Sequence, residues 1–214
     1  MAYRQLRTVL AEFLLSLQEC RELATDAKAW SQPAAPGARP QISGRRRDSM
    51  TEMAFLRAFL AWEVFIEESF ILYMLGQSPP RGRPPQRHAY PPKHSSAIEW
   101  VKEGRRYAAW TVASEVSQRA ERFFRDGRPF ASVLRGNQTV LEESRTIRNA
   151  IAHKSMTAHQ TFETLARTKI GILPPTFSVG SFLGTNVPGT VPPVSFLESY
   201  IGKIDLAARQ IVPS

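Results

Sequence analysis

The sequence predicts an all-α protein, a bundle of about five to seven helices joined by long irregular loops. Apolar residues recur at the three- and four-residue spacing of amphipathic helices in several long segments. Stretches rich in proline and glycine separate these segments. No stretch shows convincing strand-like alternation, and no internal repeat is visible. A length of 214 residues fits a single domain covering 1–214.

The first segment predicts a long amphipathic helix from about Tyr3 to Trp30. Cys20 has helical spacing with Phe13 and Leu17, so we expect its thiol to be packed in the core rather than reactive. It is the only cysteine, which excludes an internal disulfide and a cysteine-based zinc site. The apolar positions of this helix are Leu6, Val9, Leu10, Phe13, Leu14, Leu17 and Leu23. The stretch SQPAAPGARPQISGRRR that follows is expected to be an exposed connection.

A second long helix is predicted to begin near Asp48 or Ser49 and to end at Gly76. Ser49 followed by Glu52 has the pattern of a capping box, in which each side chain binds the other residue's backbone N–H. The segment is almost long and apolar enough to suggest a membrane span. Four charged side chains would then lie in mid-span, which is costly, so we expect a central helix of the bundle and no membrane partner. These charged residues are Arg57, Glu63, Glu67 and Glu68.

Residues 77–95, QSPPRGRPPQRHAYPPKHS, are predicted to form an exposed loop. Six prolines in this stretch exclude a helix. Its basic side chains leave two interpretations: a neutral linker, which we favour, or an arm that contacts a phosphate backbone.

The second half of the chain predicts four more helical regions. Residues 97–124 are expected to be helical in two pieces, and a helix from about Gln138 to His153 follows. Another helix covers MTAHQTFETLARTKI. Residues 171–194, rich in glycine and proline, are expected to be irregular. The apolar face of the last helix consists of Phe196, Leu197, Tyr200, Ile201, Ile204 and Ala207.

The chain is strongly basic, with a formal net charge of +9 and an isoelectric point near 10.2. Such a charge favours polyanionic partners: RNA, DNA or an anionic surface. Most of the basic residues are arginines, which can hold a phosphate through two parallel hydrogen bonds. A GC-rich genome would produce the same excess of arginine, and we weigh the two explanations about evenly. The N-terminus lacks the pattern of a secretory signal, so a cytoplasmic protein is expected.

Most motifs of known chemistry are missing from the sequence. It has no glycine-rich phosphate loop, no His-Glu-x-x-His zinc motif and no serine nucleophile motif. Its four histidines lack metal-ligand spacing, so neither a metal nor another cofactor is predicted. Arg148 and His153 remain as candidates. Spacing alone does not single them out, because Arg83 and His88 are separated by the same number of positions.

The surroundings of Arg148 and His153, in RTIRNAIAHKS, are distinctive. Residues 150–152 are small or compact and apolar, so a neighbouring helix can approach closely. Asn149 shares a helix face with His153, whereas Arg148 lies about 140° away from it on an ideal helix. The pair can converge if the arginine reaches over, if the helix ends near His153, or if a two-fold dimer joins two copies.

These residue types suit the cleavage of RNA without a metal. Histidine can deprotonate the ribose 2′-hydroxyl or protonate the leaving 5′-oxygen near neutral pH. Arginine can hold the phosphate oxygens and offset the developing charge, and Asn149 could orient either group. In the structural alternative, His153 caps the helix C-terminus, where a cation is favourable, and Arg148 pairs with a carboxylate.

The residues R-N-A-I-A-H at 148–153 resemble the motif of the HEPN superfamily, all-α domains that handle nucleotides and RNA. The helix FLRAFLAWEVFIEESF, the run ASEVSQRAERFFRDGRPF and the step from RNAIAHKS into FETLARTKIG resemble its RiboL-PSP branch. This likeness extends from about Met50 to Gly184. It implies a metal-independent RNA endonuclease that works as a homodimer, with the Arg and His at the dimer cleft. Many such proteins are toxins or phage-defence effectors, so an antitoxin or regulatory protein is a further expected partner.

Carried over by position, the resemblance makes Arg148 and His153 the catalytic pair and Asn149 their polar neighbour. An acidic side chain on the central helix could brace either member of the pair, or could instead form a structural ion pair. The supporting residues expected around the pair are Glu63, Glu67, Arg145 and Lys154. Two alternatives stay open: a non-catalytic HEPN module that binds a nucleotide, a nucleic acid or a partner protein, and a purely structural helical adaptor.

Overall fold

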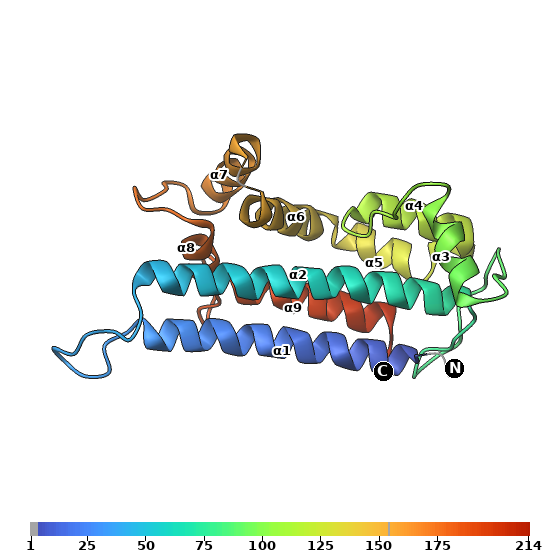
Figure 1. Ribbon diagram of the computed structural model, residues 1–214, viewed down its shortest axis with the longest axis horizontal. Coiled ribbons are helices and arrows are strands. Elements are labelled where there is room, and N and C mark those ends of the chain that lie inside the picture. Colours follow the sequence, from blue (N-terminus) through green and yellow to red (C-terminus); the bar gives the residue numbers. More distant parts are fainter. Residues whose placement is uncertain (1–3, 154) are drawn as a thin grey trace. The chain divides into compact units, whose positions relative to one another are not determined.

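The computed structural model describes residues 4–153 and 155–214, and the regular secondary structure of these residues is helical (Figure 1). The all-α prediction is confirmed. Beyond the helices, the described residues contain two isolated β-bridges, Arg87–Phe124 and Asn186–Ser195. The helices are α1 (Leu6–Trp30), α2 (Gly44–Met74), α3 (His94–Lys102), α4 (Ala113–Phe123), the 3-10 helix η1 (Arg125–Gly127), α5 (Phe130–Gly136), α6 (Gln138–Ala152), α7 (Met156–Ile170), α8 (Val179–Gly184) and α9 (Phe196–Ile211).

The number of α-helices in the described residues, nine, exceeds the five to seven expected. Two of them, α5 and α8, are only seven and six residues long, too short to show a hydrophobic period in the sequence. Helix α4 also begins later than expected, at Ala113, so residues 107–112 are not helical.

The chain divides into two compact units. Unit 1 consists of Met1–Leu15, Ala61–Glu142 and Lys203–Ser214, and unit 2 of Ser16–Leu60 and Glu143–Gly202. Helices α1, α2, α6 and α9 each contribute residues to both units. One domain over 1–214 therefore stays a prediction, and each unit is described by itself.

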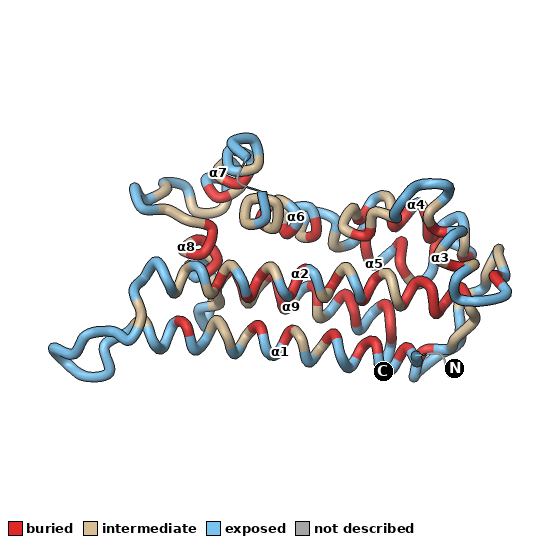
Figure 2. The backbone as a smooth tube through the Cα atoms, in the orientation of Figure 1, coloured by how far each residue is buried: buried red, intermediate tan, exposed pale blue. Residues whose placement is uncertain are grey.

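Unit 1 has a core of aromatic rings in contact with one another. The ring centroids of Phe13 in α1 and Phe65 in α2 lie 4.9 Å apart. Further along α2, Phe70 packs against Phe124 at 5.0 Å and against Phe130 of α5 at 4.9 Å. Buried positions recur along this part of α2 and along α5 (Figure 2). Aromatic burial of this kind is the main source of stability for the packing of α2, α4 and α5.

Unit 2 has a second aromatic core that joins four helices. Phe182 of α8 lies 4.4 Å from Phe196 of α9 and 5.5 Å from Phe162 of α7, measured between ring centroids. Tyr200 of α9 meets Phe55 of α2 edge-on at 6.1 Å. These contacts account for the burial of Phe196 and Tyr200 in the part of α9 that belongs to unit 2.

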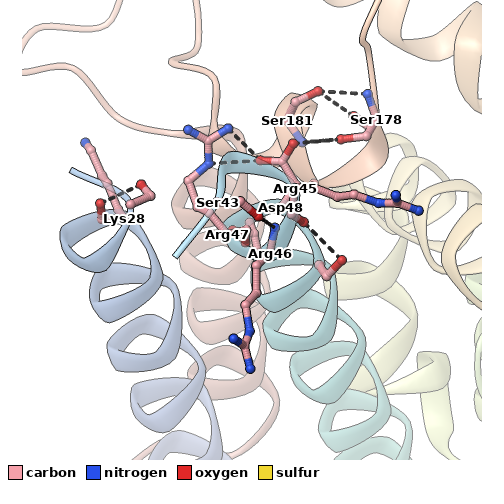
Figure 3. A network of polar contacts seen from close by, with 12 residues as sticks. Lys28, Ser43, Arg45, Arg46, Arg47, Asp48, Ser178 and Ser181 are labelled. Carbon is pink, nitrogen blue, oxygen red and sulfur yellow. Dashed lines mark hydrogen bonds and ion pairs between the residues drawn. The ribbon is translucent and has the colours of Figure 1, made fainter. Parts of the chain in front are cut away.

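The start of α2 differs from the prediction. The helix begins at Gly44, and the hydroxyl of Ser43 accepts a hydrogen bond from the backbone N–H of Arg46 at 3.3 Å (Figure 3). This is the bond that an N-cap side chain makes. Ser49 lies inside the helix, where its hydroxyl donates to the carbonyl oxygen of Arg45 at 3.1 Å. The predicted capping box is therefore wrong.

Helix α8 packs on the first turns of α2, in a segment that was expected to be irregular. Ser178 and Ser181 form a capping box at its start (Figure 3). The hydroxyl of Ser178 also donates to a carboxylate oxygen of Asp48 at 3.1 Å. Glu52 accepts a hydrogen bond from the backbone N–H of Gly180 at 2.8 Å. The prediction of an irregular 171–194 is thus wrong for Val179–Gly184, where contacts with α2 stabilise a short helix.

Candidate Arg–His site

The end of α6 positions the predicted pair. Arg148 and Asn149 lie in the last turn and a half of the helix, which ends at Ala152. The backbone N–H of His153 still donates to the carbonyl oxygen of Asn149 at 2.9 Å, but His153 itself is outside the helix. Its ring is therefore not bound to the angular spacing of helical residues.

Arg148 and His153 converge within one chain. Nη1 of Arg148 lies 3.4 Å from Nε2 of His153 and donates a hydrogen bond to Oδ1 of Asn149 at 3.1 Å. The contact arises in two of the ways considered from the sequence: the arginine reaches along the helix, and the helix ends at the histidine. All three predicted catalytic residues are thus brought together.

The role of His153 in this contact depends on its tautomer. An arginine N–H can only donate, so the contact is a hydrogen bond in the neutral tautomer that carries its proton on Nδ1 and leaves Nε2 as the acceptor. A neutral imidazole is the form that can take a proton from a hydroxyl group. Protonation of the ring would remove the acceptor and place two cations side by side.

The three side chains differ in exposure. Arg148 and Asn149 are half-buried, whereas His153 is exposed. Nε of Arg148 is buried and has no hydrogen-bond partner among the described residues. Its Nη1 contacts are an amide oxygen and a ring nitrogen, not the carboxylate that the structural alternative requires. Among the described residues, the guanidinium thus contacts an amide and an imidazole ring rather than a carboxylate.

A polar network at the start of α6, which the sequence did not reveal, fixes this helix in unit 2. Oε2 of Glu143 accepts from the hydroxyl of Tyr200 at 2.8 Å, and its Oε1 lies 2.6 Å from Nζ of Lys169. Burial, reinforced by the charge of Glu143, raises the pKa of the Tyr200 hydroxyl, which therefore stays a donor. The three residues come from α6, α9 and α7, so only the folded unit shows their connection.

Of the expected supporting residues, the structure describes Arg145, Glu63 and Glu67. Arg145 is exposed on α6, one turn before Arg148. Glu63 and Glu67 are half-buried on the part of α2 that belongs to unit 1, and their supporting role stays a prediction. Lys154 lies outside the described residues.

No group of three or more His, Cys, Asp or Glu side chains in residues 4–153 and 155–214 is arranged to hold a metal ion. Across the same residues, no helix has both the length and the apolar character needed to cross a membrane.

Comparisons with known proteins give no further identification. No protein-family model matches the chain, and no significant match is found among curated proteins or among solved structures. The relation to HEPN proteins therefore rests on the sequence resemblance, and the function is a matter for proposal.

Proposed function

We propose that the protein is a metal-independent RNA endonuclease of the HEPN type. The observation that supports this most directly is the 3.4 Å contact between Nη1 of Arg148 and Nε2 of His153 at an exposed helix end. It combines a proton acceptor with a phosphate-binding cation. The net charge of +9 is in keeping with RNA as the substrate.

In the proposed reaction, the neutral ring of His153 takes the proton from a ribose 2′-hydroxyl. The 2′-oxygen then forms a bond to the adjacent phosphorus as the bond from phosphorus to the 5′-oxygen breaks. A general acid gives a proton to that 5′-oxygen, leaving a 2′,3′-cyclic phosphate and a 5′-hydroxyl. Arg148 stabilises the charge on the phosphate oxygens, and Asn149 holds the guanidinium in position.

The acid and the base need not come from the same chain. In a two-fold homodimer that pairs the ends of two α6 helices, each copy would supply one Arg148 and one His153. One histidine would then act as base and the other as acid. Residues 150–152 are compact and are half-buried or exposed, which suits close approach by a second copy.

We further propose that the activity serves as a toxin or a phage-defence effector in the cytoplasm, with an antitoxin or another regulatory protein as partner. This part rests on the HEPN resemblance. The main alternative is a non-catalytic HEPN module that binds a nucleotide, nucleic acid or protein. The contact of Arg148 with His153 would also suit it, because a paired cation and ring can hold an anion without reacting.

Cleavage of a mixed RNA in EDTA tests the proposal. We expect the parent protein to produce fragments with 2′,3′-cyclic phosphate ends. Arg148→Ala and His153→Ala should each lower the rate by about 10²-fold or more, the usual contribution of general acid–base or electrostatic catalysis. Circular dichroism would establish that both variants remain folded.

Matched controls come from the neighbouring helix α7. His159 and Arg167 are exposed residues of unit 2, so His159→Ala and Arg167→Ala remove the same side-chain types without touching the pair. Both should retain parental rates. Equal cleavage by His153→Ala and the parent would refute the assignment of His153, and absence of cleavage with all RNAs would favour the binding module. A stable monomer in sedimentation, with full activity, would refute the composite site.

A further inference from the structure

A cavity in unit 1 gathers basic side chains around the proline-rich loop. Its volume is about 800 Å³. Two of its arginines, Arg81 and Arg83, come from the loop, and two, Arg125 and Arg128, come from the turn between α4 and α5. Asp126 is the one carboxylate that lines it.

The loop is fixed to unit 1 rather than free. The backbone N–H of Arg81 donates to the carbonyl oxygen of Pro213 at 3.0 Å, and the backbone N–H of His88 donates to the carbonyl oxygen of Phe123 at 2.9 Å. Nη1 of the Arg87 side chain donates to the carbonyl oxygen of Met74 at 2.9 Å. The loop is therefore held in place as a wall of the cavity.

The positive charges at this cavity are poorly compensated. Arg125 donates from Nη1 to Oε1 of Gln86 at 2.7 Å, and Gln86 is a neutral amide. Four guanidinium groups and one carboxylate leave a clear excess of positive charge around one space. Like charges at a concave surface raise its potential and attract anions, and a bound anion would relieve their repulsion.

The rest of the lining is suited to an apolar ring. Proline rings contribute much of the wall, and Tyr73 lies at the cavity with its hydroxyl already donating to the carbonyl oxygen of Ile211 at 2.7 Å. Proline has no backbone N–H, so the proline rings offer no donor to the hydrogen-bonding edge of a base. The volume falls in the range of small-molecule sites. The prolines are Pro79, Pro84, Pro85, Pro129 and Pro213.

We propose that this cavity binds nucleoside phosphates, with the phosphates on the arginines and the nucleoside against the proline rings. Binding is expected to be largely independent of the base. Two sources would supply this chemistry: a free nucleotide and the 5′-phosphorylated end of an RNA strand. The proposal goes beyond the endonuclease reaction and involves none of its residues, so each can fail without the other.

Calorimetric titration of the full-length protein in EDTA tests this site. The probes are ADP, UDP and adenosine, together with a 2′-O-methyl hexanucleotide carrying either a 5′-phosphate or a 5′-hydroxyl. We expect ADP and UDP to bind with similar affinity and adenosine to bind at least tenfold more weakly. If the protein binds the hexanucleotide at least tenfold more tightly with a 5′-phosphate than with a 5′-hydroxyl, the source is the end of an RNA strand. If the two hexanucleotides bind with similar affinity, the source is the free nucleotide.

Paired variants link binding to the cavity. Arg83→Gln combined with Arg128→Gln removes two exposed lining charges and should weaken ADP binding by about tenfold or more, as expected for loss of charge-assisted hydrogen bonds. Arg39→Gln combined with Arg106→Gln gives the same net charge from exposed arginines outside the cavity and should change affinity less than twofold. The proposal is overturned if ADP binds no better than adenosine and the 5′-phosphorylated hexanucleotide binds no better than its 5′-hydroxyl counterpart. It is equally overturned if the two double variants bind alike.

Discussion

Gly180 marks the closest approach of α8 to α2 and provides a sharp test of the packing in unit 2. A Cβ atom built on Gly180 would lie 2.1 Å from the carbonyl oxygen of Asp48 and 2.5 Å from its carbonyl carbon. Both are backbone atoms of α2, so no side-chain rotation relieves the clash. Since unbonded heavy atoms rest at about 3.5 Å or more, Gly180→Ala would force α8 away from α2 by roughly 1 Å.

The cost of this shift can be estimated from its parts. Overpacking in a closely packed region costs about 1–3 kcal/mol. The movement also stretches the 2.8 Å hydrogen bond from the N–H of Gly180 to Glu52, worth about 1 kcal/mol. Alanine has a better helix propensity than glycine by up to about 1 kcal/mol, which offsets part of the loss. We expect Gly180→Ala to lower the free energy of unfolding by about 1–3 kcal/mol.

The same helix supplies the control. A Cβ on Gly184 would have no other atom within 4 Å, so Gly184→Ala should be neutral or stabilise the protein by up to about 1 kcal/mol. Urea unfolding followed by circular dichroism measures both variants against the parent, with equal slopes required for the comparison. If Gly180→Ala proved as stable as Gly184→Ala, the described contact between α8 and α2 would be wrong.

Two further predictions concern titrating groups in unit 2. Cys20 is buried as expected and burial raises the pKa of its thiol, so Ellman's reagent should detect no thiol in the native protein at pH 7 and one in guanidinium chloride. Burial, with help from the charge of Asp48, raises the pKa of Glu52 above its ordinary value of 4.5, although the N–H of Gly180 acts in the opposite direction. The folded state therefore binds the proton of the Glu52 carboxyl more tightly than the unfolded state does. The stability that this gives at low pH is lost as pH rises through the raised pKa. The difference in free energy of unfolding between Glu52→Gln and the parent should therefore be more favourable to the variant at pH 7 than at pH 4. Paired urea titrations at the two pH values would check this.

The long helices were predictable because one face of each is buried along most of its length. In α9 every apolar position expected from the sequence is buried: Phe196, Leu197, Tyr200, Ile201, Ile204 and Ala207. Repeated burial on one face is what gives a sequence its helical period. In α1, Leu14 and Leu23 are only half-buried, but the remaining five positions suffice to preserve the pattern.

Predictions made from neighbouring residues were wrong where a residue distant in the sequence binds the hydrogen-bonding group concerned. Ser49 and Glu52 have the spacing of a capping box, yet Glu52 binds the N–H of Gly180, far away in the sequence. Ser43, in a stretch expected to be an exposed connection, caps the helix instead. Helix α8 was missed for the related reason that six residues rich in glycine form a helix there only against α2. A motif defined by a spacing of three or four residues cannot reveal partners that are distant in the sequence.

The candidate site was predictable in its residues but not in its geometry. Small neighbours and the shared face of Asn149 and His153 singled out this segment as the candidate, and the angle on an ideal helix left the position of Arg148 open. The ideal-helix angle between Arg148 and His153 does not apply, because the helix ends at Ala152. The network of Glu143 that holds α6 comes from three helices, and no local signal in the sequence could have revealed it.

The two Arg–His pairs of equal spacing differ in whether the surrounding structure brings the two side chains together. Arg83 faces a cavity of unit 1, while the backbone of His88 is held to Phe123, and nothing in that loop directs one side chain toward the other. For Arg148 and His153 the direction comes from the helix end. Side chains of a helix lean toward its N-terminus, so an arginine that extends toward its C-terminus needs an anchor there. Asn149 supplies that anchor through its amide oxygen, and the guanidinium, with several donors in one plane, can bind it and His153 together. Both contacts come from Nη1, and a lysine ammonium also has more than one donor on a single nitrogen. What a lysine lacks is the planar fork that holds a phosphate through two parallel hydrogen bonds, which is why the identity of Arg148, and not only its charge, matters to the proposed reaction.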